Sequence, residues 1–280
     1  KDYWQNEETK LVHFIGKDNI VFHCIIFPTM MKAHGDYIMP DNVPANEFLN
    51  LEDDKISTSR NWAVWAHEYL EDFPNQQDTL RYVLTANMPE NKDNNFTWKD
   101  FQTKNNSELV GILGNFINRV MVLSHKYYEG IVPSKTIEFE ELTEIKYFAK
   151  RIGDHLEKYE FRAALTEYMN LARLGNQFLQ AQEPWKKGDD PEAVKGIMYA
   201  ATQIAAALGQ LGEPFIPFAS EKMLAMMNVE KMSWDDLEST DEFVKAGHQL
   251  GQSELIFAKI EDEAIEAQIN KLNESKVKNN

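Results

Sequence analysis

The sequence predicts a mainly α-helical protein in which a short α/β segment precedes a bundle of helices. Two observations support this prediction. Strand-like and helix-like apolar patterns alternate only over residues 1–60. From Trp62 onward, apolar residues recur with helical spacing, and glycine or proline separates many of the helical segments. The chain has 280 residues, of which 43% are hydrophobic, so it can bury a substantial core.

The α/β segment is expected to contain a buried strand, a helix and a hairpin, at residues 10–16, 17–32 and 47–57. Gly16 ends the strand, and Gly35 stops the helix. The segment contains neither a GxGxxG motif nor a P-loop, and it is too short to close a doubly wound sheet. We therefore expect it either to dock on an absent element or to be the end of a longer catalytic domain.

The helical part is expected to form a bundle, because short loops between neighbouring helices favour antiparallel packing. The expected helices lie at about residues 63–73, 78–87, 98–128, 138–157, 159–183, 190–211, 215–228 and 256–275. A loop is expected over residues 229–242.

Composition excludes several classes of protein. No apolar run reaches the ~20 residues needed to span a bilayer, and no secretory leader opens the chain. The single cysteine, Cys24, excludes an intrachain disulfide and a multi-cysteine zinc site. Because Cys24 lies in an apolar stretch, we expect it to be a small core residue. We expect a cytoplasmic protein without a membrane partner or a metal site of its own.

The charge distribution limits where a nucleic acid could bind. The net charge of −16 argues against binding a phosphate backbone without regard to sequence, and we expect no DNA partner. Acidic residues outnumber basic ones in residues 1–105 and again in 188–280, whereas residues 106–187 hold 11 of each. A nucleic-acid surface is therefore expected in the middle third of the chain.

A polar loop at residues 55–60 carries the residue types that suit a polyphosphate. Lys55 supplies a mobile positive charge, Arg60 can form a forked contact with phosphate oxygens, and the hydroxyls between them can donate hydrogen bonds. From the residues alone, a serine-rich surface turn with incidental charges is the simpler interpretation.

Residues 55–59 resemble the KMSKS signature of class I aminoacyl-tRNA synthetases, whose mobile loop closes over ATP and stabilises pyrophosphate during adenylate formation. The resemblance implies that Lys55, Ser57, Thr58 and Ser59 are catalytic. It also implies that Lys55, Thr58 and Arg60 contact ATP. The second lysine of the signature is Thr58 here. Loss of this cation should weaken the loop unless another cation compensates.

The segment upstream is similar to a stretch of the methionyl-tRNA synthetase family that reads HFIGKD, then three residues, then FH. The resemblance implies that Asp18 and Asn19 lie against the substrates and that His23 lies beside the methionine pocket. Many bacterial members have isoleucine in place of Asn19, whereas others also read DN. From the residues alone, Asp18 could cap the next helix, and a lone histidine such as His23 is more often a core residue.

Two elements of the helical part carry groups that suit single-stranded RNA. Asn115 and Arg119 are one helical turn apart, so an amide that reads base edges and a guanidinium that stacks can reach one ligand. Pro184 ends a helix and leaves Trp185 projecting, where an indole can stack on a base. From spacing alone, a bundle edge and a packing tryptophan are the simpler interpretations.

These two elements, about 66 residues apart, resemble the anticodon-reading pair of the methionyl family, an N-x-x-x-R helix face and a PW tryptophan. The resemblance implies that Asn115, Arg119 and Trp185 bind the CAU anticodon of the methionine tRNA.

The resemblance covers nearly the whole chain and implies three parts. Residues 1–60 would be the C-terminal part of a Rossmann-like catalytic domain, residues 61–105 a stem-contact or connecting region, and residues 106–280 an α-helical anticodon-binding domain. The implied protein is a ligase that activates methionine with ATP and magnesium and joins it to its tRNA. The family's HIGH signature and its zinc or zinc-like knuckle are expected upstream of Lys1. This fragment alone is therefore expected to be inactive.

Other functions remain open at this point. The departure at Thr58 favours a stand-alone, non-catalytic RNA-binding module to some extent. Another class I synthetase, of the leucyl, valyl or cysteinyl type, is a further alternative, against which the HFIGKD–FH run and Trp185 argue. A plain helical scaffold would leave residues 10–60 unexplained.

Overall fold

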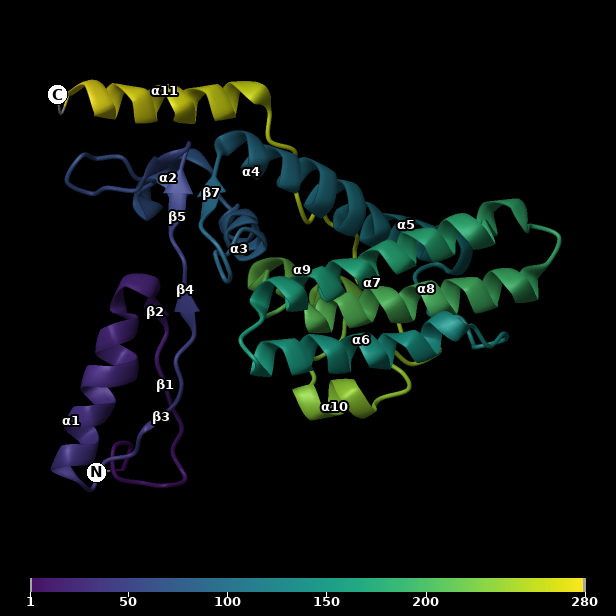
Figure 1. Cartoon of the computed structure of the whole chain (residues 1–280). Coiled ribbons are helices and arrows are strands. Elements are labelled where there is room, and N and C mark those ends of the chain that lie inside the picture. Colours follow the sequence, from purple (N-terminus) through teal and green to yellow (C-terminus); the bar gives the residue numbers. More distant parts are fainter. Residues whose placement is uncertain (1, 279–280) are drawn as a thin grey trace.

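The computed structural model describes residues 2–278 of the chain, and side-chain burial as far as residue 274. As predicted, the protein is mainly helical (Figure 1). A small α/β part at the N-terminal end lies beside one end of a helical bundle, and the last helix returns to lie beside the segment that connects the two.

The α/β part contains two short pairs of parallel strands. β1 (Leu11–Val12) pairs with β3 (Pro40–Asn42), and β2 (Ile15–Gly16) pairs with β4 (Ala45–Asn46). The single strand predicted over residues 10–16 is therefore divided into two pieces. Parallel strands need a crossover connection, and the helical residues 17–34 provide it.

The crossover is helical throughout, but its geometry changes along its length. It contains a 3₁₀ turn η1 (Lys17–Asn19), a π-helical stretch η2 (Phe22–Ile26) and the α-helix α1 (Phe27–His34). The helix ends at Gly35, whose φ of +79° favours glycine. The predicted helix and its predicted stop are both confirmed.

The predicted hairpin is also present, and a third strand extends it. β5 (Leu49–Leu51) and β6 (Asp54–Lys55) pair antiparallel. The two residues between them, 52 and 53, have φ values of 47° and 61°, as a tight two-residue hairpin turn requires. β7 (Asn94–Phe96) pairs parallel with β5. β7 was not predicted, because its two asparagines disfavour strands in isolation.

The connecting region and the first long helix follow the prediction closely. α2 (Ala66–Asp72) and α3 (Gln77–Ala86) lie within one or a few residues of the predicted bounds. The predicted helix at 98–128 is confirmed as one continuous segment, formed by α4 (Trp98–Lys104), the π-helical η3 (Asn105–Gly114) and α5 (Asn115–Tyr128).

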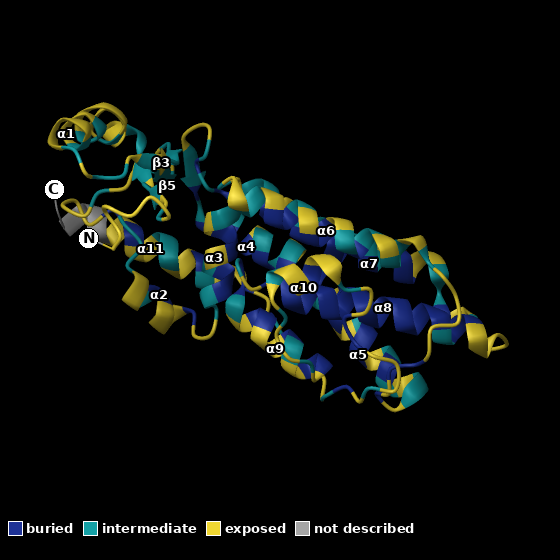
Figure 2. Ribbon diagram, turned by 90° about the horizontal axis from the view of Figure 1, so that it is seen from below, coloured by how far each residue is buried: buried dark blue, intermediate teal, exposed yellow. Residues whose placement is uncertain are grey.

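The remaining helices complete the bundle. They are α6 (Glu140–Glu157), α7 (Phe161–Gln182), the 3₁₀ turn η4 (Pro184–Lys186), α8 (Pro191–Leu211), α9 (Pro217–Met227) and α10 (Trp234–Ser239). α8 is the centre of the bundle, and Figure 2 shows it in dark blue, because nearly all its residues are buried. α10 lies inside the predicted loop at 229–242, where the Ser233 hydroxyl accepts the backbone N–H of Asp236 and caps the helix.

The final helix begins later than predicted. α11 (Asp262–Lys278) starts six residues after the predicted position, because the preceding chain is irregular and its backbone accepts hydrogen bonds from side chains of α4 and η3. The backbone of Ile260 exchanges hydrogen bonds of 2.8 and 2.9 Å with the Asn106 side chain. Phe257 and Ile260 are buried. In this segment, burial of Phe257 and Ile260 in the core therefore outweighs the helical spacing of the apolar residues.

α11 returns to the connecting region and is tied there by charged contacts (Figure 1). Lys271 pairs with Glu68 at 2.7 Å and with Asp72 at 3.0 Å, both on α2. Asp262, at the start of α11, accepts hydrogen bonds from the side chains of Lys99 and Gln102 on α4. The C-terminal helix thus packs beside the segment that follows the polar loop at residues 55–60.

The helical crossover leaves an apolar face uncovered. Its exposed large side chains are Ile20, Val21, Phe22, Ile25, Ile26 and Met30, each between 42% and 60% exposed. Cys24 is exposed as well, so the prediction of a core cysteine is wrong. The crossover lies beside the short strands β1 and β3 (Figure 1), and the Phe27 ring of α1 contacts the His13 ring that follows β1. Among the described helices, none is long and apolar enough to cross a membrane.

The packing of α7 on α5 depends on a glycine. A Cβ atom added at Gly175 would lie 2.5 Å from Cζ of the buried Phe116 ring. We expect Gly175→Ala to lower the free energy of unfolding, at the upper end of the range of about 1–3 kcal/mol for overpacked cores. That loss exceeds the roughly 1 kcal/mol that alanine gains over glycine inside a helix.

Urea unfolding of the two proteins measures the difference. Gly188→Ala is the matched control, because nothing lies within 4 Å of its added Cβ. Equal midpoints for Gly175→Ala and the unmodified chain would contradict the close approach of α5 and α7.

Candidate functional site

The first group of predicted site residues lies on the crossover and on the strand segment before it. The Nδ1 atoms of His13 and His23 are 3.1 Å apart, and their rings meet edge to face with centroids separated by 5.0 Å. The Phe27 ring packs against His13 at 5.2 Å. His23 is therefore held in place by a second histidine, which was not among the predicted site residues. The only sequence signal for His13 was its position at the start of the HFIGKD run.

Asp18 and Asn19 lie on the first turn of the crossover, and both are exposed. The Asn19 amide donates to Asp18 Oδ1 at 3.4 Å. Asp18 lies inside the turn and does not cap it, since the capping position is Gly16. A Cβ at Gly16 would be 2.8 Å from Asp18 Oδ1, so the glycine gives the carboxylate room to lie over the strand end.

The contact between His13 and His23 should make the stability of the fold depend on pH. Burial lowers the pKa of His13, and the nearby His23 lowers it further. The unfolded chain therefore binds a proton at this residue at higher pH than the folded chain does. The stability that neutral His13 contributes is present above the ordinary histidine pKa of about 6.5. It is lost as the pH falls through the lowered pKa of the folded state.

We expect His23→Asn to raise the pKa of His13 without restoring it fully, because the burial remains. An NMR titration of the imidazole Cε1–H signals measures this change. His34→Asn is the matched control, since that ring contacts Tyr37. An unchanged pKa for His13 in His23→Asn would show that the two rings do not interact.

A charged cluster joins the crossover to the hairpin region. Lys17 Nζ pairs with Glu47 at 2.5 Å and with Asp93 at 2.6 Å. Hydrogen bonds to Asp93 and Glu47 raise the pKa of Lys17, and Lys17 holds the pKa of Asp93 below its usual value. Lys17 Nζ also lies 4.5 Å from the centroid of the Phe48 ring. This cluster fixes the start of the crossover relative to the hairpin that carries the polar loop.

The polar loop is short, and its two ends are held together by backbone hydrogen bonds. The backbones of Ser57 and Trp62 exchange two hydrogen bonds of 2.9 Å, and these close the loop. Trp62 is buried, and its indole N–H donates to the Leu51 carbonyl at 2.9 Å. Residues 58–61 are therefore exposed on an anchored base, which allows the tip to move while the ends stay fixed.

Within the loop, the predicted side chains lie close together. The hydroxyls of Ser57 and Ser59 are 3.2 Å apart. The Arg60 guanidinium donates to the Lys55 carbonyl at 2.9 Å and pairs with Asp54 at 3.3 Å, so it is turned back toward the hairpin.

The two remaining predicted residues of the loop are both exposed. Thr58 lies at the tip. Lys55 Nζ lies 5.7 Å from the centroid of the Phe48 ring, the same ring that Lys17 approaches.

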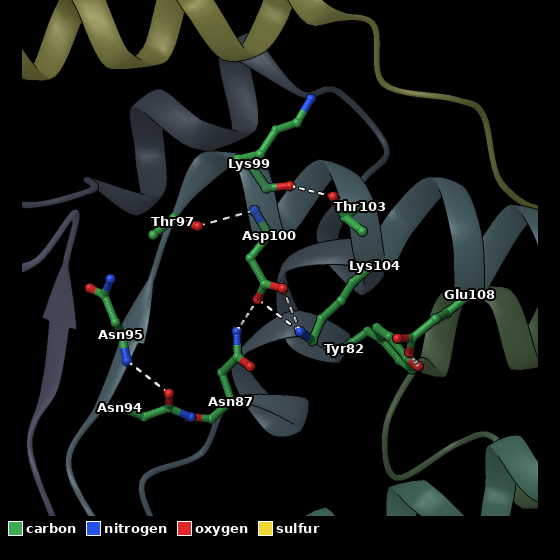
Figure 3. Close-up of polar contacts among 10 residues, drawn as sticks. All are labelled: Tyr82, Asn87, Asn94, Asn95, Thr97, Lys99, Asp100, Thr103, Lys104 and Glu108. Carbon is green, nitrogen blue, oxygen red and sulfur yellow. Dashed lines mark hydrogen bonds and ion pairs between the residues drawn. The ribbon is translucent and has the colours of Figure 1, made fainter.

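A polar network connects the end of α3 to α4, the first part of the long helix (Figure 3). Asp100, in the first turn of α4, accepts hydrogen bonds from the Asn87 amide at 2.6 Å and from Lys104 at 2.6 and 2.8 Å. The Thr97 hydroxyl accepts the backbone N–H of Asp100 and caps α4. The network thus fixes the direction of the continuous helix that begins at α4 and ends with α5.

In the third group of predicted site residues, Arg119 and Trp185 are in contact, whereas Asn115 donates to Asn176 on α7. Asn115 and Arg119 lie one turn apart on α5. α7 ends at Glu183, which is left-handed with φ 44° and ψ 58°, and the buried Pro184 starts the next turn. Trp185 is thereby turned outward and remains 39% exposed.

The guanidinium and the indole of this group are in contact. Arg119 Cζ lies 5.1 Å from the centroid of the Trp185 ring, within the range of a cation–π contact. A hollow of about 270 Å³ lies beside them, and Asn118, Val122 and Leu123 complete its lining. The fold therefore brings together residues that are 66 positions apart in the sequence.

Asn118 and Val122 were not predicted as members of this face. Their positions three residues after Asn115 and three after Arg119 could have identified them, since residues at that spacing share a helix face. Across residues 2–274, no three side chains among His, Cys, Asp and Glu gather where they could hold a metal ion.

Comparison with known proteins assigns both halves of the chain. Residues 1–121 match the family described as tRNA synthetases class I (M), and residues 134–276 match the anticodon-binding domain of methionyl tRNA ligase.

Individual relatives and solved structures agree with these matches. The methionine–tRNA ligase of Flavobacterium psychrophilum is 62% identical and that of Christiangramia forsetii 59%, over 99% of this chain. The chain spans about two fifths of the length of these relatives, 41% and 42% respectively. The fold is similar to that of Mycobacterium tuberculosis methionyl-tRNA synthetase in complex with methionyl-adenylate. The TM-score is 0.79 at 22% identity, over 88% of this chain and 49% of that one.

The sequence motifs, the helical bundle behind a class I remnant and the family matches all agree. The chain therefore belongs to the methionyl-tRNA ligase family and includes its anticodon-binding domain.

Proposed function

We propose that this chain is the part of a methionine–tRNA ligase that recognises the CAU anticodon of the methionine tRNA and supplies the ATP loop of the activating site. The observation that supports this most strongly is the meeting of Arg119 and Trp185 beside an open hollow of about 270 Å³. This face lies on the part of the chain that matches the anticodon-binding domain.

Each residue of this face has a distinct chemical role in the proposal. Trp185 stacks on a splayed anticodon base, an interaction worth about 1–3 kcal/mol. Arg119 supports that stack and neutralises backbone phosphate. The amide of Asn115 reads the edge of a neighbouring base. The balanced charge of residues 106–187 permits RNA to approach here despite the acidic net charge of the chain.

The polar loop acts in the first step of the reaction. The methionine carboxylate attacks the α-phosphorus of ATP, a bond to the bridging oxygen breaks, and pyrophosphate leaves with the negative charge. Lys55 and the hydroxyls of Ser57, Thr58 and Ser59 stabilise that charge as it develops. ATP brings magnesium as part of the substrate. Arg60 reaches the phosphates once it leaves Asp54.

The remaining site residues belong to the methionine side of the same centre. Asp18 and Asn19 contact substrate from the exposed first turn of the crossover. His23, held by His13, forms part of the pocket wall. The apolar face of the crossover is covered by the rest of the catalytic domain, since the chain spans about two fifths of its relatives.

We also propose a functional division at residues 60/61 and 105/106, although one hydrophobic cluster runs from Leu51 to Leu272.

Because the proposed role is charging of tRNA for protein synthesis, we propose that the full-length enzyme acts in the cytoplasm.

Charging kinetics of the full-length ligase test this function. We expect kcat/KM for methionine tRNA to fall when any one anticodon base is changed, while methionine-dependent ATP–pyrophosphate exchange without tRNA stays the same. Equal charging of tRNAs with changed anticodons would remove the anticodon assignment. A full-length protein without pyrophosphate exchange would instead support a non-catalytic RNA-binding module.

A further inference from the structure

The side chain of Asn176, on α7, lies against the helix that carries Asn115. Its amide nitrogen donates to the Ile112 carbonyl at 2.9 Å and to the Ala172 carbonyl at 3.1 Å. An asparagine amide has two N–H hydrogens, so both are in use. Turning the amide over would place its oxygen against two carbonyl oxygens. The orientation of Asn176 is therefore set by its surroundings.

This orientation determines what Asn176 offers to the anticodon face. Its Oδ1 is directed to Asn115, whose Nδ2 lies 3.4 Å away. A carbonyl oxygen accepts hydrogen bonds and cannot donate them. Asn115 must therefore present its NH₂ group to Asn176, because the reverse orientation would bring two carbonyl oxygens together.

The hydrogen bond to Asn176 therefore determines which way the side-chain amide of Asn115 is oriented. The oxygen and nitrogen of an amide diverge from its carbon, so Oδ1 of Asn115 stays clear of Asn176 while Nδ2 donates to it. Asn115 is exposed, whereas Asn176 is half-buried. A ligand at this face therefore meets the acceptor Oδ1 of Asn115 in a fixed position, beside the one N–H of Asn115 that Asn176 does not engage.

We propose that Asn176 is a positioning residue that turns Oδ1 of Asn115 toward the ligand, so that this site selects a base with an amino group at pyrimidine C4 or purine C6. Cytosine and adenine present such a donor, whereas uracil and guanine present a keto oxygen at the same place. This inference rests on the proposed anticodon function. It adds the chemical class of the base that Asn115 reads and the half-buried residue that sets this preference.

The test uses charging by the full-length ligase of three tRNAs: the normal one and two with single anticodon changes. Changing C to U at the first position, or A to inosine at the second, replaces an amino group by a keto oxygen, keeps the ring size and adds no other amino group. We expect Asn176→Ala to reduce discrimination at one of these two positions roughly tenfold, within the range for a good base contact. Discrimination is the ratio of kcat/KM values for normal and changed tRNA.

A double-mutant cycle shows whether Asn176 acts through Asn115. In an Asn115→Ala enzyme, adding Asn176→Ala should not change the ratio further. A ratio that falls further in that background would overturn the positioning role, as would equal losses of charging for all three tRNAs with Asn176→Ala. If Asn115→Ala alone leaves every ratio unchanged, the anticodon role of Asn115 itself is wrong.

Two controls separate this effect from general damage. Asn170→Ala makes the same substitution on α7, where the side chain bonds Glu167 and Arg173 of its own helix. It should leave all three ratios unchanged. If Asn176→Ala unfolds, Asn176→Ser repeats the test, because its hydroxyl can still bond the Ala172 carbonyl one turn back. Pyrophosphate exchange and thermal melting verify that each enzyme is folded.

Discussion

Lys55→Ala is expected to lower methionine-dependent ATP–pyrophosphate exchange by the full-length ligase about 10²–10³-fold, the cost of removing one donor from developing negative charge. Lys55 is the only lysine of the loop, since Thr58 stands where the signature has a second one. Arg60 must leave the Lys55 carbonyl and Asp54 before it reaches the phosphates, so we expect it to replace Lys55 only in part. Lys55 is exposed and can move toward the phosphates.

Steady-state exchange assays at saturating ATP and methionine measure this effect. Lys92→Ala is the control, because Lys92 is an exposed lysine outside the loop. Binding of the anticodon hairpin should be the same in both variants. An exchange rate within twofold of the unmodified enzyme would contradict a role for Lys55 in adenylate formation.

Trp185→Ala is expected to have the opposite profile. We expect kcat/KM for charging methionine tRNA to fall about 5- to 150-fold, which corresponds to about 1–3 kcal/mol for the loss of one stacked base. Pyrophosphate exchange without tRNA should remain near normal, because Trp185 and the polar loop lie on different parts of the molecule. The indole also supports Arg119, and its removal releases that guanidinium.

Two further variants separate stacking from packing. Trp185→Phe retains an aromatic face and should lose less charging than the alanine variant. Phe218→Ala removes another exposed aromatic, on α9, and should not affect charging. If pyrophosphate exchange fell together with charging in Trp185→Ala, the assignment of Trp185 to the anticodon would be wrong.

The local sequence pattern predicted the helices well, because the spacing of apolar residues and the glycine and proline breaks indicate the same helix bounds. The helix at 98–128 and the stop at Gly35 are examples. The predictions failed where tertiary contacts prevail over local preference. β7 forms from Asn94 and Asn95 because β5 offers a partner strand. The chain around Phe257 stays irregular because it fills a space in the core.

The candidate site shows the same division. The placement of Asn115 one helical turn before Arg119 follows from their spacing, and the exposure of Trp185 follows from the proline before it. The roles of His13 and Asn176 could not be predicted in this way. Each depends on the docking of two segments, such as α5 on α7, which no local pattern specifies. The exposure of Cys24 likewise depends on what covers the crossover, and its apolar neighbours gave no sign of it.

The central claim is that the face formed by Asn115, Arg119 and Trp185 reads the anticodon. The most direct test is the affinity of the full-length ligase for a labelled RNA hairpin with the CAU anticodon, against a hairpin with one changed base, at a single stated salt concentration. We expect the CAU hairpin to bind roughly tenfold or more tightly, and we expect Trp185→Ala to remove most of that preference. Equal affinity of the unmodified enzyme for the two hairpins would contradict the claim.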